Sequence, residues 1–488
     1  MNKMKFKYIS LLIVGMVMFM VSCDKYLDIN IDPNQSTISR VDLQLSSAQL
    51  QTAIGLGQRI FPRVSTLCQY HTGGPGVALT DEDQHKWAPS ESNEVFRTCY
   101  RSTNSLSYIL KNSTESYYIA IAKIMTAYNF GICADLFGNI PFDEAVRGDI
   151  ADGSILHPNY DNAKDVVYPG AERLLLEAID LINNGGVVLP ADDDLVYGGN
   201  MDNWSKFAHT LLLKMYLRQG ASGQQKAADL YQSDDQFIID NSEMAAVAFP
   251  GGSQGSNPFW NAAKSTALGN FYVGTTTMID YLGGTQDPRL DAYFDTNNAG
   301  IQIGLYPGDI QNASSNASFS VPAGALAANG GLMFGPTLPV IFMSAWEGNL
   351  LLAEAASRGW ITTDANAAYE AAVNASFDYL GLDPADAATY LAGAGAMNAG
   401  DPIKSIALQK WVCMFEMQPV ESWIEVRRFD SSSTPYFTSP GGVFSSPTEN
   451  ALGTGKYPSI LPYPENEESL NQNFPGQHPI TDKVFWDN

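Results

Sequence analysis

The sequence is poor in charged residues, and most poor in basic ones. Of its 488 residues 16% are charged, and 28 Lys and Arg stand against 52 Asp and Glu, for a net charge of -24. A field of this sign repels phosphate backbones and anionic membrane surfaces, so we expect no nucleic-acid partner. The apolar fraction of 45% favours a globular body over a disordered chain.

Residues that build metal and catalytic centres are also scarce. The five Cys include no C-x-x-C pair, and the five His form no H-E-x-x-H motif. No phosphate-binding or dinucleotide fingerprint occurs either. We therefore expect no metal, no cofactor and no catalytic residue. A surface glycoside hydrolase remains one alternative, because that chemistry needs only two suitably spaced carboxylates. An adhesion or scaffold protein is the other.

Long apolar runs are confined to the N-terminus. Residues 9–21 are mainly apolar and follow three Lys, which is the pattern of a secretory signal peptide. The run is too short to span a bilayer, and we expect no later stretch to do so. Cys23 follows directly after a small residue, as in a bacterial lipobox. We predict that residues 1–22 are removed, that Cys23 is acylated and that residues 23–40 form a tether; an ordinary cleaved signal is the alternative.

Apolar residues recur at helical spacing in two blocks, about 41–220 and 341–430. Paired periods of this length predict helical hairpins of the tetratricopeptide type. Between the blocks, about 221–340, Gly, Ser, Asn and Pro are dense, and the tail 431–488 is similarly rich in turns. We expect a mostly α single domain over 41–488 with long irregular loops and few short strands. The 221–340 loops are expected to face a ligand, because long irregular segments often carry function.

Several blocks keep one order along the chain and together resemble the SusD/RagB family of Bacteroidetes outer-membrane lipoproteins. They are residues 23–30 and 32–34 after the lipobox, D-L-F-G-N-I-P-F-D-E-A at 135–145, Y-G-G-N at 197–200, W-S-K-F-A at 204–208, D-P-R-L at 287–290, residues 353–359, Q-K-W at 409–411, W-I-E-V-R-R at 423–428, and Tyr463-Pro464 with Glu467.

The resemblance implies a SusD-like, mostly helical body on the cell surface. It implies a lipid-anchored protein of the outer membrane whose partner is a TonB-dependent, SusC-like transporter. It also implies that the protein binds a nutrient, either a glycan or an oligopeptide, without any chemistry of its own.

Aromatic residues in polar, turn-forming surroundings are the candidate ligand contacts. An exposed indole can cover the apolar face of a sugar ring, while Asn side chains bind the hydroxyls at its edge. The candidates are Trp87, Asn93, Asn257, Phe259, Trp260, Asn261, Phe271, Tyr272 and Tyr306. The alternative is that these aromatics pack the loops onto the body.

Two charged motifs are expected to be structural. Arg427 and Arg428 follow Glu421 and Glu425 on a predicted helix, which favours ion pairs within the fold at a helical surface. Residues 287–289, Asp-Pro-Arg, predict a helix start.

Overall fold

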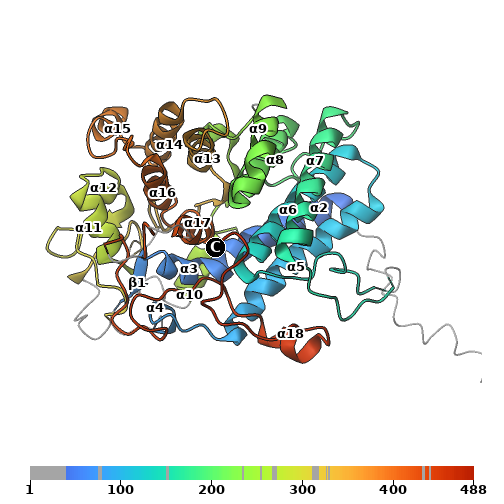
Figure 1. Ribbon diagram of the computed structural model, residues 1–488, viewed down its shortest axis with the longest axis horizontal. Coiled ribbons are helices and arrows are strands. Elements are labelled where there is room, and N and C mark those ends of the chain that lie inside the picture. The colour runs from blue at the N-terminus through green and yellow to red at the C-terminus, as the bar shows by residue number, and fades with distance from the viewer. Residues whose placement is uncertain are drawn as a thin grey trace, which may run out of the picture. The chain divides into compact units, whose positions relative to one another are not determined.

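The predicted mostly helical fold is confirmed in the computed structural model (Figure 1). The structure describes residues 40–74, 80–149, 153–233, 236–252, 255–265, 272–309, 318–325, 327, 330–430, 435–438 and 441–487. Residues 41–488 form one compact unit. The predicted lipidation site Cys23 and the tether lie outside the described residues.

The N-terminal helical block contains long helices that pack as neighbours in sequence. Helix α5 packs against α2 and α6, and α7 packs against α6 and α8. The elements of this block are α2 (Val41–Ile54), the π-helix η1 (Gly55–Ile60), α3 (Phe61–Leu67), β1 (His71–Gly73), α4 (Thr80–Asp83), α5 (Pro89–Asn112), α6 (Ser116–Phe137), η2 (Ala163–Val167), α7 (Tyr168–Asn183), α8 (Met201–Arg218), η3 (Gly220–Gly223) and α9 (Gln224–Ser233).

The C-terminal block repeats the hairpin arrangement, since α13 packs along α14 and also touches α16. The Ser344 hydroxyl accepts the Glu347 N–H at 3.2 Å and so begins α13 at its N-terminus. The elements are α13 (Ala345–Ser357), α14 (Ala365–Tyr379), α15 (Pro384–Leu391), α16 (Pro402–Cys413), α17 (Pro419–Asp430) and α18 (Glu465–Leu470).

The segment between the blocks has short elements and long connections, as its turn-rich composition predicts. Its elements are η4 (Asn241–Glu243), β2 (Ala245–Val247), α10 (Pro258–Ser265), β3 (Tyr272–Gly274), α11 (Thr276–Gly284), α12 (Arg289–Tyr293), β4 (Phe294–Asp295), β5 (Val321–Pro322) and β6 (Val340–Met343). The strands pair in twos, and all three pairs are antiparallel: β1 with β3, β2 with β6, and β4 with β5.

Helix α6 corrects the expectation that no stretch after the N-terminal apolar run is long and apolar enough to span a bilayer. Within the described chain it is long and apolar enough to cross a membrane by length and composition. However, 83% of its most apolar stretch is buried inside the protein. The neighbouring helices α5 and α7 cover it, so its apolar character is that of a core helix.

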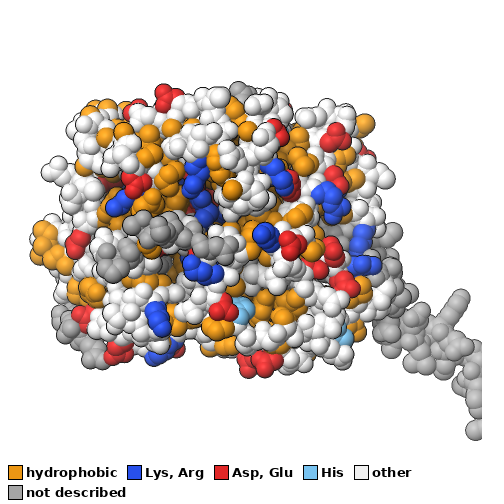
Figure 2. Space-filling model, in the orientation of Figure 1, with side chains coloured by type: hydrophobic (Ala, Val, Ile, Leu, Met, Phe, Trp, Pro, Cys, Tyr) orange, Lys and Arg blue, Asp and Glu red, His pale blue; other side chains and the backbone are white. Residues whose placement is uncertain are grey.

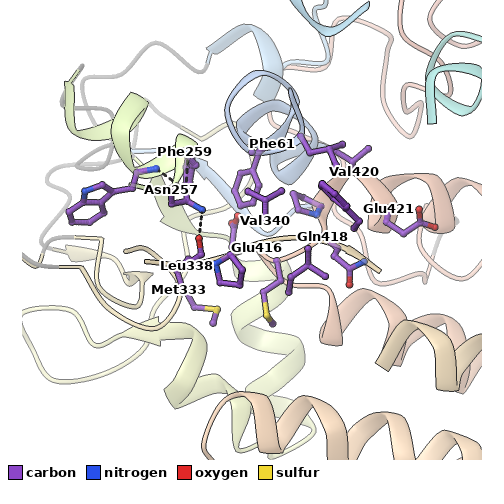
Figure 3. A pocket seen from close by; sticks show the side chains of 18 of the residues that line it. Phe61, Asn257, Phe259, Met333, Leu338, Val340, Glu416, Gln418, Val420 and Glu421 are labelled. Carbon is purple, nitrogen blue, oxygen red and sulfur yellow. Dashed lines mark hydrogen bonds between the residues drawn. The ribbon is translucent and has the colours of Figure 1, made fainter. Parts of the chain in front are cut away.

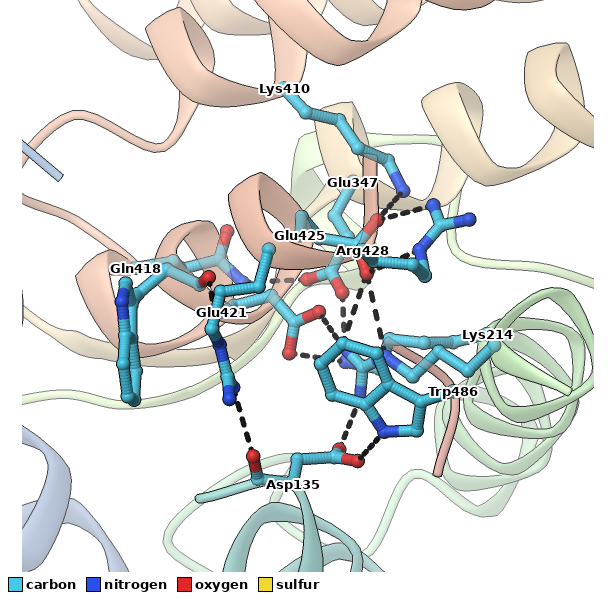
Figure 4. Close-up of polar contacts among 12 residues, drawn as sticks. Asp135, Lys214, Glu347, Lys410, Gln418, Glu421, Glu425, Arg428 and Trp486 are labelled. Atoms are coloured by element: carbon cyan, nitrogen blue, oxygen red, sulfur yellow. Dashed lines mark hydrogen bonds and ion pairs between the residues drawn. The ribbon is translucent and has the colours of Figure 1, made fainter. Parts of the chain in front are cut away.

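A network of buried ion pairs joins the two helical blocks (Figure 4). It was expected at a helical surface, and that placement is wrong because every member is buried. The ion pairing itself is confirmed for Arg428, whereas Arg427 donates to the backbone carbonyls of Ser459 and Asp135. The Arg428 guanidinium donates to both carboxylate oxygens of Glu354, at 2.7 and 2.6 Å, and to Glu425 at 2.6 Å. Lys410 reaches Glu425 at 2.7 Å.

The same network continues into the N-terminal block through α8. Arg218 donates to Asp135 on α6 at 2.5 Å and also to Glu421 on α17. Lys214 lies 2.8 Å from Glu347 and 3.1 Å from Glu421. Each charge therefore has an opposite charge beside it, which is the condition under which ionised groups can be buried.

Two further buried arginines also serve the fold. Arg289 is fully buried, and its guanidinium donates to Asp287 at 2.6 Å and to Gln409 at 2.8 Å. The predicted helix start at this motif is confirmed, because α12 begins at Arg289. Arg427 lies 3.9 Å from the centre of the Trp423 ring and 5.0 Å from that of Trp486. It thereby holds the C-terminal tail against α17.

We expect Arg428→Met to lower the free energy of unfolding by about 3–5 kcal/mol, because it leaves two buried carboxylates without their shared partner. Arg173→Met is the matched control. Arg173 is 65% exposed and 3.9 Å from Glu177, and exposed pairs contribute only about 0–1 kcal/mol. Urea denaturation of both variants measures the difference. Equal losses in the two variants would contradict a special role for the buried network.

The network also predicts a pH dependence through Glu354. Burial raises its pKa, but the charge and hydrogen bonds of Arg428 outweigh burial and bring the pKa to about 2. A carboxylate with a depressed folded pKa stabilises the protein above its unfolded pKa and loses this contribution as the pH falls. We expect Glu354→Gln to be less stable than the parent at pH 6, with a smaller gap at pH 3.5. Denaturant titrations at both pH values test this, and a gap independent of pH would refute it.

Candidate functional site

One pocket gathers three of the residues that the sequence singled out, Asn257, Phe259 and Trp260 (Figure 3). It holds about 790 Å³ of space free of atoms, part of it open to solvent. Four stretches of chain line it, together with side chains of α6 and α14: the η1–α3 region, the start of α10, residues 332–342 and the α16–α17 turn with the first residues of α17.

The start of α10 is fixed by Asn257, which is 7% exposed. Its side-chain oxygen accepts the N–H groups of Phe259 and Trp260 at 2.9 and 3.1 Å. Its amide nitrogen donates to the Leu338 carbonyl at 2.9 Å. Both ends of the Asn257 amide thus contact backbone groups and fix the start of α10, and its predicted contact with a ligand hydroxyl stays a prediction.

Aromatic rings form one wall of the pocket. Phe259 is buried and stacks on Phe61, with ring centroids 4.6 Å apart and 30° between the planes. Trp260 is partly exposed, and its ring centroid lies 5.0 Å from that of Phe334. Trp260 thus offers apolar ring surface to a ligand while packing against Phe334 fixes the ring.

The side of the pocket away from Asn257 is polar, and Figure 3 shows Gln418 and Glu421 there, with Glu416 between them and Leu338. The Glu416 carboxylate lies 2.5 Å from the His71 ring nitrogen and accepts the Ser65 hydroxyl at 3.0 Å. Glu421 belongs to the buried ion network. This end was missed from the sequence, because its residues stand in a helix–helix turn that carries no recognisable ligand motif.

The other predicted aromatics that the structure describes, Trp87, Tyr272 and Tyr306, are not part of this pocket's lining. The expectation of an exposed Trp87 is wrong: the side chain is 8% exposed, and Arg63 lies 5.5 Å from its ring centre. Tyr272 is buried 4.4 Å from the His71 ring. Tyr306 is 40% exposed, and its hydroxyl donates to the Ser446 carbonyl at 3.0 Å. Phe271 lies outside the described residues.

The two other asparagines make local structural contacts. Asn93 accepts the Asn466 N–H at 3.0 Å, and exposed Asn261 donates to the Ser256 carbonyl at 3.1 Å. Neither lines the pocket. Trp87 and Asn93 therefore do not join Trp260 in one aromatic and amide surface.

Acidic residues and cysteines could support metal or thiol chemistry, but among the described residues Asp194 and Cys413 contribute to the fold. No cluster of three or more His, Cys, Asp or Glu suited to a metal occurs among the described residues. Asp194 accepts from Gln49, Trp204 and the Gly199 N–H, so it organises a turn. The four described cysteines are free and buried. Burial raises the pKa of the Cys413 thiol, which disfavours the reactive thiolate.

The chain belongs to the SusD-like family described as "Starch-binding associating with outer membrane", which it matches over residues 33–451. The resemblance noted in the sequence is thereby confirmed. This is a family of binding proteins typically associated with the outer membrane of Bacteroidetes. No curated protein sequence matches the chain.

Solved structures share the fold over nearly all of the chain. One named a chitin-binding protein is 23% identical with a TM-score of 0.77, covering 92% of this chain and 100% of its own. A SusD/RagB family protein from Bacteroides thetaiotaomicron is 19% identical with a TM-score of 0.77, covering 92% and 99%. A chitin-binding SusD homolog from Flavobacterium johnsoniae is 19% identical with a TM-score of 0.75, also covering 92% and 99%. At these identities the likeness establishes the fold.

Proposed function

We propose that this protein is a lipid-anchored receptor that captures a nutrient at the cell surface and delivers it to a TonB-dependent, SusC-like transporter in the outer membrane. Its membership of a starch-binding, outer-membrane family supports the binding role. The names of two chitin-binding structural relatives support a glycan as ligand. Acylation of Cys23 would supply the anchor, because attached acyl chains hold a protein stably on a bilayer.

The observation that carries the binding role is the pocket beside Trp260. Its partly exposed indole, packed against the buried Phe334, offers a flat apolar surface on which a sugar ring can stack. An oligopeptide with apolar side chains is the alternative ligand, because aromatic surfaces serve both classes.

The surface charge agrees with a neutral ligand. On the face shown in Figure 2, acidic and basic side chains are interspersed, within a chain whose net charge is -24. An anionic polymer would meet net repulsion from such a protein. A neutral glycan or a neutral peptide would not.

We expect Trp260→Ala to weaken glycan binding by roughly tenfold or more, because removing an aromatic stacking interaction from a desolvated site costs about 1–3 kcal/mol. Trp360→Ala is the matched control, since Trp360 is also partly exposed but lies outside the pocket lining. Calorimetric titration of the leaderless protein with a panel of oligosaccharides and oligopeptides measures both variants. An equal loss in both variants would place the ligand elsewhere. Release of reducing ends during the titration would favour the glycoside hydrolase alternative.

We expect Cys23→Ala to release the protein from the outer membrane, because the variant lacks the thiol that would be acylated. Fractionation of cells carrying each form measures this, with Cys68→Ala as the control, since Cys68 is buried in the folded body. In the same cells the parent protein is expected to co-purify with a large outer-membrane transporter. Membrane retention of the Cys23 variant would contradict the lipid anchor, and absence of any transporter would favour the adhesion or scaffold alternative.

A further inference from the structure

The polar end of the pocket contains a buried hydrogen-bond acceptor that the protein leaves unused. Gln418 stands just before α17, lines the pocket and is 4% exposed. Its amide nitrogen donates to a Glu347 carboxylate oxygen at 2.7 Å. Its amide oxygen is buried and has no hydrogen-bond partner among the described residues. Buried polar atoms of this kind are rare, because losing water without gaining a partner is unfavourable.

The ion network fixes which end of this amide faces the pocket. The other carboxylate oxygen of Glu347 lies 2.8 Å from the Lys214 ammonium, and this pairing keeps Glu347 an acceptor. An acceptor must be met by the NH₂ group of Gln418, so the oxygen is the end that remains free. Figure 4 shows Gln418 at the edge of the network, and Figure 3 shows the same residue at the polar end of the pocket.

The groups around this acceptor are either apolar or already paired. Phe61, Val340, Met417 and Val420 contribute apolar surface. The carboxylate of Glu416 is occupied by His71 and Ser65, and that of Glu421 by Lys214 and Arg218. Among the buried side-chain atoms described in the pocket lining, the Gln418 oxygen is therefore the one without a hydrogen-bond partner, and a ligand N–H or O–H could supply it.

We propose that this pocket recognises a secondary amide, whose N–H donates to the Gln418 oxygen while its apolar substituent packs against Phe61 and Val340. The inference rests on the proposed function and deepens it by naming the chemical group that is bound. A bare sugar ring fits less well, because several hydroxyls would lose water and find one acceptor. An amide brings one donor and an adjacent methyl or methylene group. Its carbonyl points back toward Trp260, away from the carboxylates of Glu416 and Glu421.

Two nutrient classes carry this group, N-acetylated amino sugars and peptides. Three probes of similar size separate them: N,N′-diacetylchitobiose, cellobiose and an N-acetyl-dipeptide N-methylamide. We expect an amide-bearing probe to bind at least tenfold more tightly than cellobiose in calorimetric titrations. Preference for the diacetylated sugar identifies a glycan source, and preference for the peptide identifies a peptide source. Both results support amide recognition.

Gln418→Met tests the acceptor, because Met has a similar length and apolar volume but no carbonyl oxygen. We expect affinity for the amide probe to fall by several-fold to about tenfold, a larger loss than that for cellobiose. The matched control is Gln477→Met, whose amide donates to the Tyr463 carbonyl outside the pocket. Equal binding of cellobiose and the diacetylated sugar, with no effect of Gln418→Met, would overturn the inference and leave the proposed glycan receptor intact. Failure of every glycan and peptide to bind would overturn both.

Saturation-transfer NMR on the unaltered protein provides a second test that is independent of whether the variant folds. The acetyl methyl protons should receive the strongest saturation, since they would be enclosed by the pocket. Stronger saturation of the sugar-ring or peptide backbone protons would refute placement of the amide beside Gln418.

Discussion

The buried ion network on α17 is the interaction on which the arrangement of the two helical blocks depends. Arg428 on α17 pairs with Glu354 on α13 and with Glu425 on its own helix, while Glu421 pairs with Lys214 and Arg218 on α8. Burying charges costs hydration free energy, and good pairing recovers it without necessarily adding net stability. A network of this kind therefore acts mainly by favouring one arrangement of the packed helices over others. A shifted helix would leave a charge buried without its partner.

The same network organises the candidate binding pocket. Gln418 is held by Glu347, and Glu421 is both a pocket residue and a partner of Lys214. The polar end of the pocket is thus an outer part of the fold's own hydrogen-bonded core. Its groups are oriented before a ligand arrives, so binding need not spend free energy on ordering them.

The sequence predicts the helices better than it predicts the site, for a physical reason. Helical spacing is a local property, and it correctly predicts a mostly helical fold with few short strands. Burial of charge is set by distant partners: Arg428 looks like a surface residue until Glu354, 74 positions away, is placed beside it. Charged side chains are seldom fully buried, so a surface was the reasonable prediction.

The site shows the same limit residue by residue. Trp260 lines the pocket as its turn-forming surroundings indicate, whereas Trp87 has equally polar neighbours and is buried. Asn257 has a side chain that can bind a hydroxyl, but its oxygen accepts hydrogen bonds from the first backbone N–H groups of α10. Gln418 has no signature in the sequence. Its significance comes from an unpaired oxygen that is buried only after α8, α13 and α17 have packed together.

The balance of contacts in the pocket also bears on how a delivery protein would work. Its carboxylates are compensated within the protein, so a neutral ligand gains no strong ion pair there. What remains is apolar contact with aromatic rings and one hydrogen bond to Gln418, and a single neutral hydrogen bond contributes only about 0.5–1.5 kcal/mol. Such a pocket selects its ligand by shape and by one donor, and holds it loosely. Loose binding is what transfer requires, because a receptor that hands its ligand to a transporter must release it on every cycle.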